Sequence, residues 1–134
     1  MDWTKIGIPV RLQLSYLLLA ALWNLAGLAL IAQGMRAPGP TASAGIAAYL
    51  LVLALVIFIA ARRLSWLYGL ASLLVGLGAA SAVVQAFQLD PSLWPSAFWR
   101  YAGILLNGFG VLASVWGGRA ALIRRRLPAG ASLQ

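Results

Sequence analysis

Two asparagines, Asn24 and Asn107, are the first candidates for chemistry, because each lies in the middle of a long apolar run. A side-chain amide in hydrocarbon is costly unless it is hydrogen-bonded. Helical rise places both amides about 18 Å from the same membrane boundary. We therefore expect them to be hydrogen-bonded to each other, directly or through one water, either as a link between two helices or as a ligand or water site.

The rest of the sequence offers few groups for catalysis. It contains no Cys and no His, and its two acids, Asp2 and Asp90, lie outside the apolar runs. Disulfides, Cys/His metal sites and haem ligation by His are excluded, as are paired carboxylates and the usual nucleophile–base pairs. We therefore expect no catalytic residue, no metal and no cofactor, in a protein that is not an enzyme.

The composition predicts that lipid surrounds most of the chain. Of 134 residues, 63% are hydrophobic and 9% are charged, whereas a soluble domain has roughly 25% charged residues. The net charge of +8 comes from basic residues at the ends of apolar runs, which is a signal of membrane topology and not of nucleic-acid binding. We expect an all-α polytopic membrane protein, with residues 1–134 forming a single transmembrane domain.

Four apolar runs are long enough to cross a hydrocarbon core of about 30 Å. Gly34 and the prolines that follow it end the first run, and the adjacent Arg62 and Arg63 mark a tight turn between the second and the third. The expected order is an interfacial segment over 1–12, spans over 13–33, 43–61, 67–87 and 97–121, and a cytoplasmic tail over 122–134.

The basic residues also predict the orientation. Apart from Arg36 and Arg100, all of them fall on one side of the expected spans, and an excess of Lys and Arg marks the cytoplasmic side. We therefore expect an up-down four-helix bundle with both termini in the cytoplasm. The alanine- and arginine-rich composition favours a bacterial protein, which would place the chain in the inner membrane.

Small residues and basic clusters predict the contacts of the bundle. Transmembrane helices approach closely where small residues repeat at steps of three or four, and the residues expected to pack in this way are Gly27, Gly76, Gly103, Gly110 and Ser114. A second group of residues is basic and sets the topology, or binds anionic lipid headgroups; it consists of Arg62, Arg63, Arg124, Arg125 and Arg126.

Three glutamines lie toward the expected outer ends of the first and third spans: Gln33, Gln85 and Gln88. They are either solvated at the membrane interface or part of an outer polar vestibule, which Arg36 and Arg100 would make attractive to anions. The sequence leaves both interpretations open.

Three functions fit these features. The first is an accessory or scaffold subunit of a larger membrane complex, favoured because the expected spans hold no carboxylate and no cofactor ligand and have several packing faces. The second is a small homo-oligomeric transporter or channel for a neutral or anionic solute. The third is a lipid-binding or lipid-export helper. The expected partners are the lipid bilayer and another membrane subunit or a second copy of the chain.

Overall fold

The computed structural model describes residues 7–126. This part of the chain is all-α, with four α-helices: α1 (Ile8–Ala32), α2 (Ala44–Arg63), α3 (Ser65–Gln88) and α4 (Ala97–Arg126), and a short 3-10 helix, η2 (Pro91–Leu93), in the α3–α4 loop. Each of the four α-helices is long and apolar enough to cross a membrane.

The first helix starts five residues before the expected span and takes in part of the segment expected to lie at the interface. Pro9 is in its first turn, where the fixed φ of proline suits a helix and its missing N–H is not needed. At the other end Gly34 has a positive φ of 75°, and the N–H groups of Gly34 and Met35 donate to carbonyls of the last helical turn at 2.9 Å. This is the Schellman pattern, which ends a helix.

The other helix boundaries follow from breakers and their absence. Leu64 alone separates α2 from α3, with φ −135° and ψ 86°, so the tight turn expected at Arg62 and Arg63 is present. The last helix continues five residues beyond the expected span, because Pro128 is the first strong helix breaker after it. Its 30 residues span about 45 Å, more than a hydrocarbon core requires.

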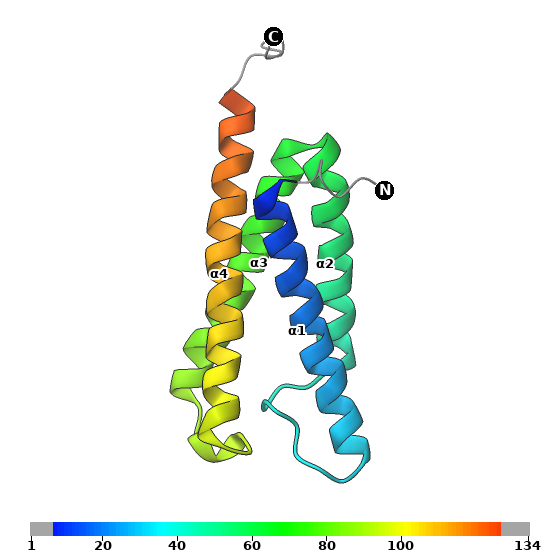
Figure 1. Cartoon of the computed structure of the whole chain (residues 1–134), viewed down its shortest axis with the longest axis vertical. Coiled ribbons are helices and arrows are strands. Elements are labelled where there is room, and N and C mark those ends of the chain that lie inside the picture. Colours follow the sequence, from blue (N-terminus) through cyan, green and yellow to red (C-terminus); the bar gives the residue numbers. More distant parts are fainter. Residues whose placement is uncertain (1–6, 127–134) are drawn as a thin grey trace.

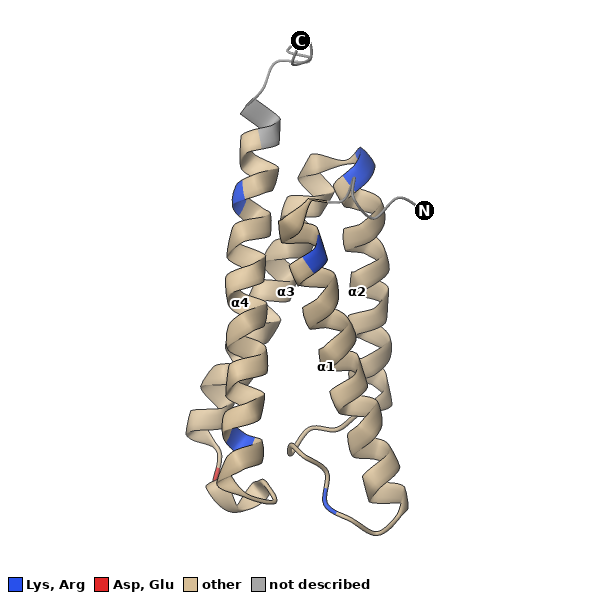
Figure 2. Ribbon diagram, in the orientation of Figure 1, with Lys and Arg blue, Asp and Glu red and all other residues tan. Residues whose placement is uncertain are grey.

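The four helices form a ring in which each has two main neighbours. The largest contact is between α3 and α4, and α1 contacts both α2 and α4. In Figure 1 the start of α1, the α2–α3 turn and the end of α4 lie at one end, and the other two loops lie at the opposite end. Figure 2 shows the basic residues toward these two ends of the bundle.

The two ends of the bundle differ in packing. The half of the bundle that contains the α2–α3 turn, which we name the turn half, holds the largest fully buried side chains: Leu17, Ile57, Tyr68, Gln13 and Ser72. The opposite half, which contains the α1–α2 and α3–α4 loops, we name the loop half. A cavity of about 460 Å³ lies between the helices in the loop half.

Candidate functional site

The turn half is closed by a polar contact between α1 and α3. Gln13 is fully buried, and its Nε2 donates to the Ser72 hydroxyl at 2.9 Å. Gly117 of α4 leaves room for this amide, since a Cβ at Gly117 would lie 2.5 Å from the Gln13 Nε2. The buried Gln13 Oε1 has no hydrogen-bond partner in the described part of the chain. Side chains therefore fill the interior at this level.

The next level toward the loop half is a contact between α1 and α4. The Tyr16 hydroxyl donates to Asn107 Oδ1 at 2.9 Å, and the Asn107 amide donates to the Gly103 carbonyl at 2.8 Å. Gly110 lies against the tyrosine ring, where a Cβ would be 2.5 Å from the nearest ring carbons. Asn107 is thus held by Tyr16, a partner that the sequence did not predict.

Asn24 has a different role from Asn107. Its amide donates to the Ala20 carbonyl at 2.9 Å, and its Oδ1 accepts the Ser43 backbone N–H at 3.2 Å. Asn24 therefore fixes the loop that enters α2. The expected direct hydrogen bond between Asn24 and Asn107 is absent from the described structure. Each amide NH₂ donates instead to a backbone carbonyl one turn earlier. Each Oδ1 accepts from another donor, the Ser43 N–H at Asn24 and the Tyr16 hydroxyl at Asn107.

Both asparagines nevertheless line the same cavity, the one of about 460 Å³ in the loop half. A smaller compartment of about 70 Å³ adjoins it and shares part of its lining. We name the two compartments together the vestibule. The polar or aromatic side chains that line the larger compartment are Tyr16, Trp23, Asn24, Thr41, Tyr49, Ser81, Gln85 and Asn107.

Arginine lines the smaller compartment of the vestibule. Arg100 Nε donates to the Ala86 carbonyl at 2.8 Å, and its guanidinium lies 5.9 Å from the Phe87 ring centroid and 5.8 Å from that of Trp94. These contacts hold a positive charge beside the polar side chains. Trp94 is itself buried, although it lies in a loop.

The two loops of this end are joined by polar contacts. Arg36, in the α1–α2 loop, donates to the Ser92 carbonyl in the α3–α4 loop. Asp90 is fully exposed, and hydrogen bonds from Ser92 lower the pKa of its carboxyl below the ordinary value. The Asp90 carboxylate accepts the Ser92 backbone N–H at 2.8 Å, so this loop favours the ionised acid.

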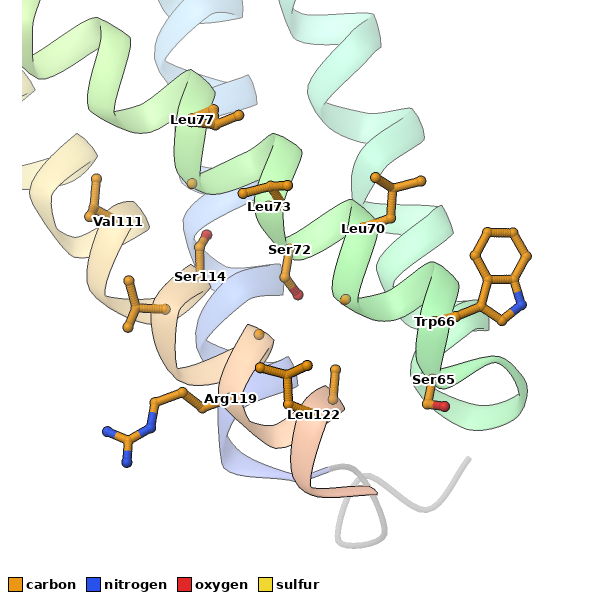
Figure 3. A pocket seen from close by; sticks show the side chains of 15 residues that line it. Ser65, Trp66, Leu70, Ser72, Leu73, Leu77, Val111, Ser114, Arg119 and Leu122 are labelled. Atoms are coloured by element: carbon orange, nitrogen blue, oxygen red, sulfur yellow. The ribbon is translucent and has the colours of Figure 1, made fainter. Parts of the chain in front are cut away.

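A second concave surface lies on the outside of α3 and α4. It is a groove of about 770 Å³, which we name the α3–α4 groove, and its floor includes Gly69, Gly76 and Gly118. In Figure 3 the side chains of Trp66 and Arg119 point away from one another on opposite rims. Leucines from both helices form much of the remaining wall.

The glycines expected at packing faces have different neighbours. A Cβ at Gly76 would lie 3.1 Å from the Ser114 Cβ, which puts both residues in the α3–α4 contact. Gly27 lies against the α1–α2 loop and not a neighbouring helix, with Ala42 Cβ 2.7 Å from the added atom. At Gly103 the nearest atom belongs to Trp23, at 3.8 Å.

The residues expected at anionic headgroups lie at the end of α2 and the end of α4. Arg62 and Arg63 are exposed, and the Arg62 guanidinium lies 4.2 Å from the centroid of the Phe58 ring. The side chains of Arg124, Arg125 and Arg126 lie outside the described part of the structure, although their backbone belongs to α4. No described contact joins the two groups into one site.

The glutamine cluster divides in space. Gln85 lines both compartments of the vestibule, whereas Gln33 and Gln88 line neither. The sequence analysis missed Gln13 and Tyr16, although a signal for both exists. Extending the α1 stripe of Ala20, Asn24 and Gly27 backward at steps of four and three reaches these two residues.

We compared the chain with protein families, curated proteins and solved structures. No protein-family model matches the chain, and neither the curated proteins nor the solved structures gave a match.

Proposed function

We propose that this chain is an accessory or scaffold subunit of a larger complex in the bacterial inner membrane and has no catalytic chemistry of its own. In this proposal its four helices cross the bilayer as an up-down bundle, with both termini and the α2–α3 turn in the cytoplasm. The distribution of Lys and Arg supports this orientation. The loop half then faces the outer side of the membrane.

The observation that carries the proposal is the α3–α4 groove. Gly69 and Gly76 face α4, whereas a Cβ at Gly118 would meet nothing within 4 Å. The open position at Gly118 would let another helix approach closely, as in packed transmembrane helices. The occupant that we propose is a transmembrane helix of a partner subunit. The vestibule ends at the closed turn half, so the described bundle offers no polar path through itself, and this favours a scaffold over a carrier.

Charge adds a second reason for a protein partner. Arg119 is exposed at one rim of the groove. Asp90, the single acid in the described part of the chain, lies at the opposite end of the bundle. A partner helix with an acidic side chain near its cytoplasmic end would complement Arg119.

The test is the mass of the native particle, extracted in a nanodisc, for the wild-type chain and two matched variants. A Cβ at Gly118 or at Gly108 would meet nothing within 4 Å, but only Gly118 lines the groove. Gly118→Leu therefore places a bulky side chain in the groove with no clash at its Cβ, and Gly108→Leu is the control. We expect a stoichiometric heteromeric complex that Gly118→Leu dissociates and Gly108→Leu leaves intact.

Other outcomes would contradict the proposal. A particle that contains only lipid in the groove would indicate the lipid-binding function. A homo-oligomer would favour the second candidate, a small transporter or channel, for which the vestibule with Asn24 and Asn107 is the supporting observation. In that case these two asparagines are the first residues to substitute.

A further inference from the structure

We propose that the vestibule is a binding site for a small anion that enters from the outer side of the membrane. The inference rests on the membrane orientation proposed above and not on the identity of a partner subunit. It follows from the chemistry of the lining, the position of Arg100 and the volume of the cavity.

The lining is mainly apolar, but it includes several hydrogen-bond donors that are still available. An amide NH₂ has two N–H donors, and Asn24, Asn107 and Gln85 each use one of them within the described structure. The Trp23 indole N–H and the Thr41 hydroxyl line the same space. Donors that converge on a cavity bind acceptor atoms, such as the oxygens of a carboxylate or sulfonate.

The positive charge of Arg100 favours an anionic ligand over a neutral one. Arg100 lines the smaller compartment, and its Nε uses one of the five N–H donors of the guanidinium. Among the described residues, no carboxylate lines either compartment. Asp90 is nearby in sequence, but it faces solvent in the loop and is outweighed at this end by Arg36 and Arg100. A cation would find no counter-charge in the vestibule.

Size and closure set the other limits on the ligand. A cavity of about 460 Å³ has room for roughly fifteen water molecules at ~30 Å³ each, so a small organic anion fits with some of its hydration. Tyr16 and Asn107 form the floor, and the buried Gln13 and Ser72 lie beyond it. An anion that enters from the loop half therefore stops at the Tyr16–Asn107 bond.

Single cysteines test this inference cleanly, because the natural chain has none. Ala82 lines both compartments. Ala80 is on the same helix, about 200° away around its axis, and lines neither. Ala82→Cys and Ala80→Cys are therefore the test and its matched control.

Two membrane-impermeant thiol reagents of opposite charge are the probes: 2-sulfonatoethyl methanethiosulfonate, an anion, and its trimethylammonium analogue, a cation. Each rate is measured in right-side-out vesicles of the expression host and divided by the rate of the same reagent with 2-mercaptoethanol. For Ala82→Cys we expect the normalised rate of the anion to exceed that of the cation by about tenfold, the lower range for field focusing in a charged cleft. For Ala80→Cys we expect both rates to be much slower.

Substitution of Arg100 links the selectivity to its source. In the Ala82→Cys background, Arg100→Gln should bring the anion-to-cation ratio to about one, and Arg100→Lys should keep it well above one. The ratio compares two reagents on the same protein, so a general loss of stability does not imitate the expected change.

Four results would overturn the assignment of the vestibule as an anion site. They are a ratio of one or less in Ala82→Cys, a ratio that Arg100→Gln leaves unchanged, equal reactivity in Ala80→Cys, and thiols that react only after the protein is unfolded in SDS. Reaction of Ala82→Cys in inside-out vesicles alone would place the vestibule on the cytoplasmic side and refute the outer assignment. The accessory-subunit proposal is decided separately, by the mass of the native particle.

Discussion

The contact between Gly110 and Tyr16 leads to the sharpest prediction about stability. A methyl group at Gly110 would lie 2.5 Å from the nearest carbons of the Tyr16 ring. Carbon atoms pack best at about 3.5–4.0 Å, so Gly110→Ala requires the ring, or the whole of α1, to move by about 1 Å. The ring is held at its far end by the hydrogen bond to Asn107, which leaves it little freedom to rotate away.

Two effects set the loss of stability expected for Gly110→Ala. Overpacking of a filled interior typically costs about 1–3 kcal/mol. Displacement of the tyrosine also breaks the bond to Asn107, and interhelical hydrogen bonds in membranes contribute about 0.6 kcal/mol on average and up to about 1.7. Alanine is the better helix former by about 1 kcal/mol, which offsets part of the loss in Gly110→Ala itself.

A matched control removes the helix-propensity contribution. Gly108 is two residues earlier on α4, and a Cβ there meets nothing within 4 Å. Gly108→Ala should therefore be neutral or slightly stabilising. The difference in the free energy of unfolding between the two alanine variants should be about 2–4 kcal/mol, with Gly110→Ala the less stable.

The measurement is reversible unfolding in mixed micelles, followed by far-UV circular dichroism as the mole fraction of SDS rises. Tyr16→Ala completes the test, because it removes the ring that the new methyl group would strike. In the Tyr16→Ala background, Gly110→Ala should lose most of its additional cost. Equal stability of Gly110→Ala and Gly108→Ala, or an unchanged cost in the Tyr16→Ala background, would refute the packing that we describe between α1 and α4.

Two further predictions concern the ends of the bundle. Gly117→Ala should be less stable than the adjacent Gly118→Ala by about 1–2 kcal/mol in the same SDS titration. The reason is that a Cβ at Gly117 would lie 2.5 Å from the Gln13 amide, whereas a Cβ at Gly118 would meet nothing within 4 Å. Equal stability of the two variants would mean that the Gln13 side chain moves aside freely. In the loop half, the pKa of Asp90 is lowered by hydrogen bonds from Ser92, so its contribution to stability is present above the unfolded pKa and is lost as the pH falls through the lower folded value. Ser92→Gly should raise this pKa toward the ordinary aspartate value in an NMR titration of the side-chain carboxyl carbon, and an unchanged pKa would exclude the Ser92 hydroxyl as a cause.

The positions of the helices were predictable from the sequence, and the reasons are local. Apolar runs of sufficient length, Gly34 after the first and the Arg62–Arg63 pair after the second, define where each helix lies. The errors lie at the ends, where a helix continues until something stops it. Pro9 permits an earlier start of α1, and α4 runs on to Arg126.

The rotation of each helix about its axis could not be read from the sequence in the same way. Depth in the membrane follows from residue number, so placing Asn24 and Asn107 near one level was possible, and both do line one cavity. Which atoms meet depends on how all four helices pack. In the packed bundle the Tyr16 hydroxyl donates to Asn107, and the Ser43 backbone N–H donates to Asn24.

The sequence by itself determined a class of protein and a list of absences. A chain with 63% hydrophobic residues, 9% charged residues and neither Cys nor His forms apolar helices and offers no thiol and no imidazole, because these properties depend on composition and local pattern alone. Only the tertiary structure decided that one half of the bundle is filled by Gln13, Ser72 and Tyr68 while the other half encloses a cavity beside Arg100. That division depends on where small and large side chains of different helices coincide, and such coincidences exist only once the helices have packed.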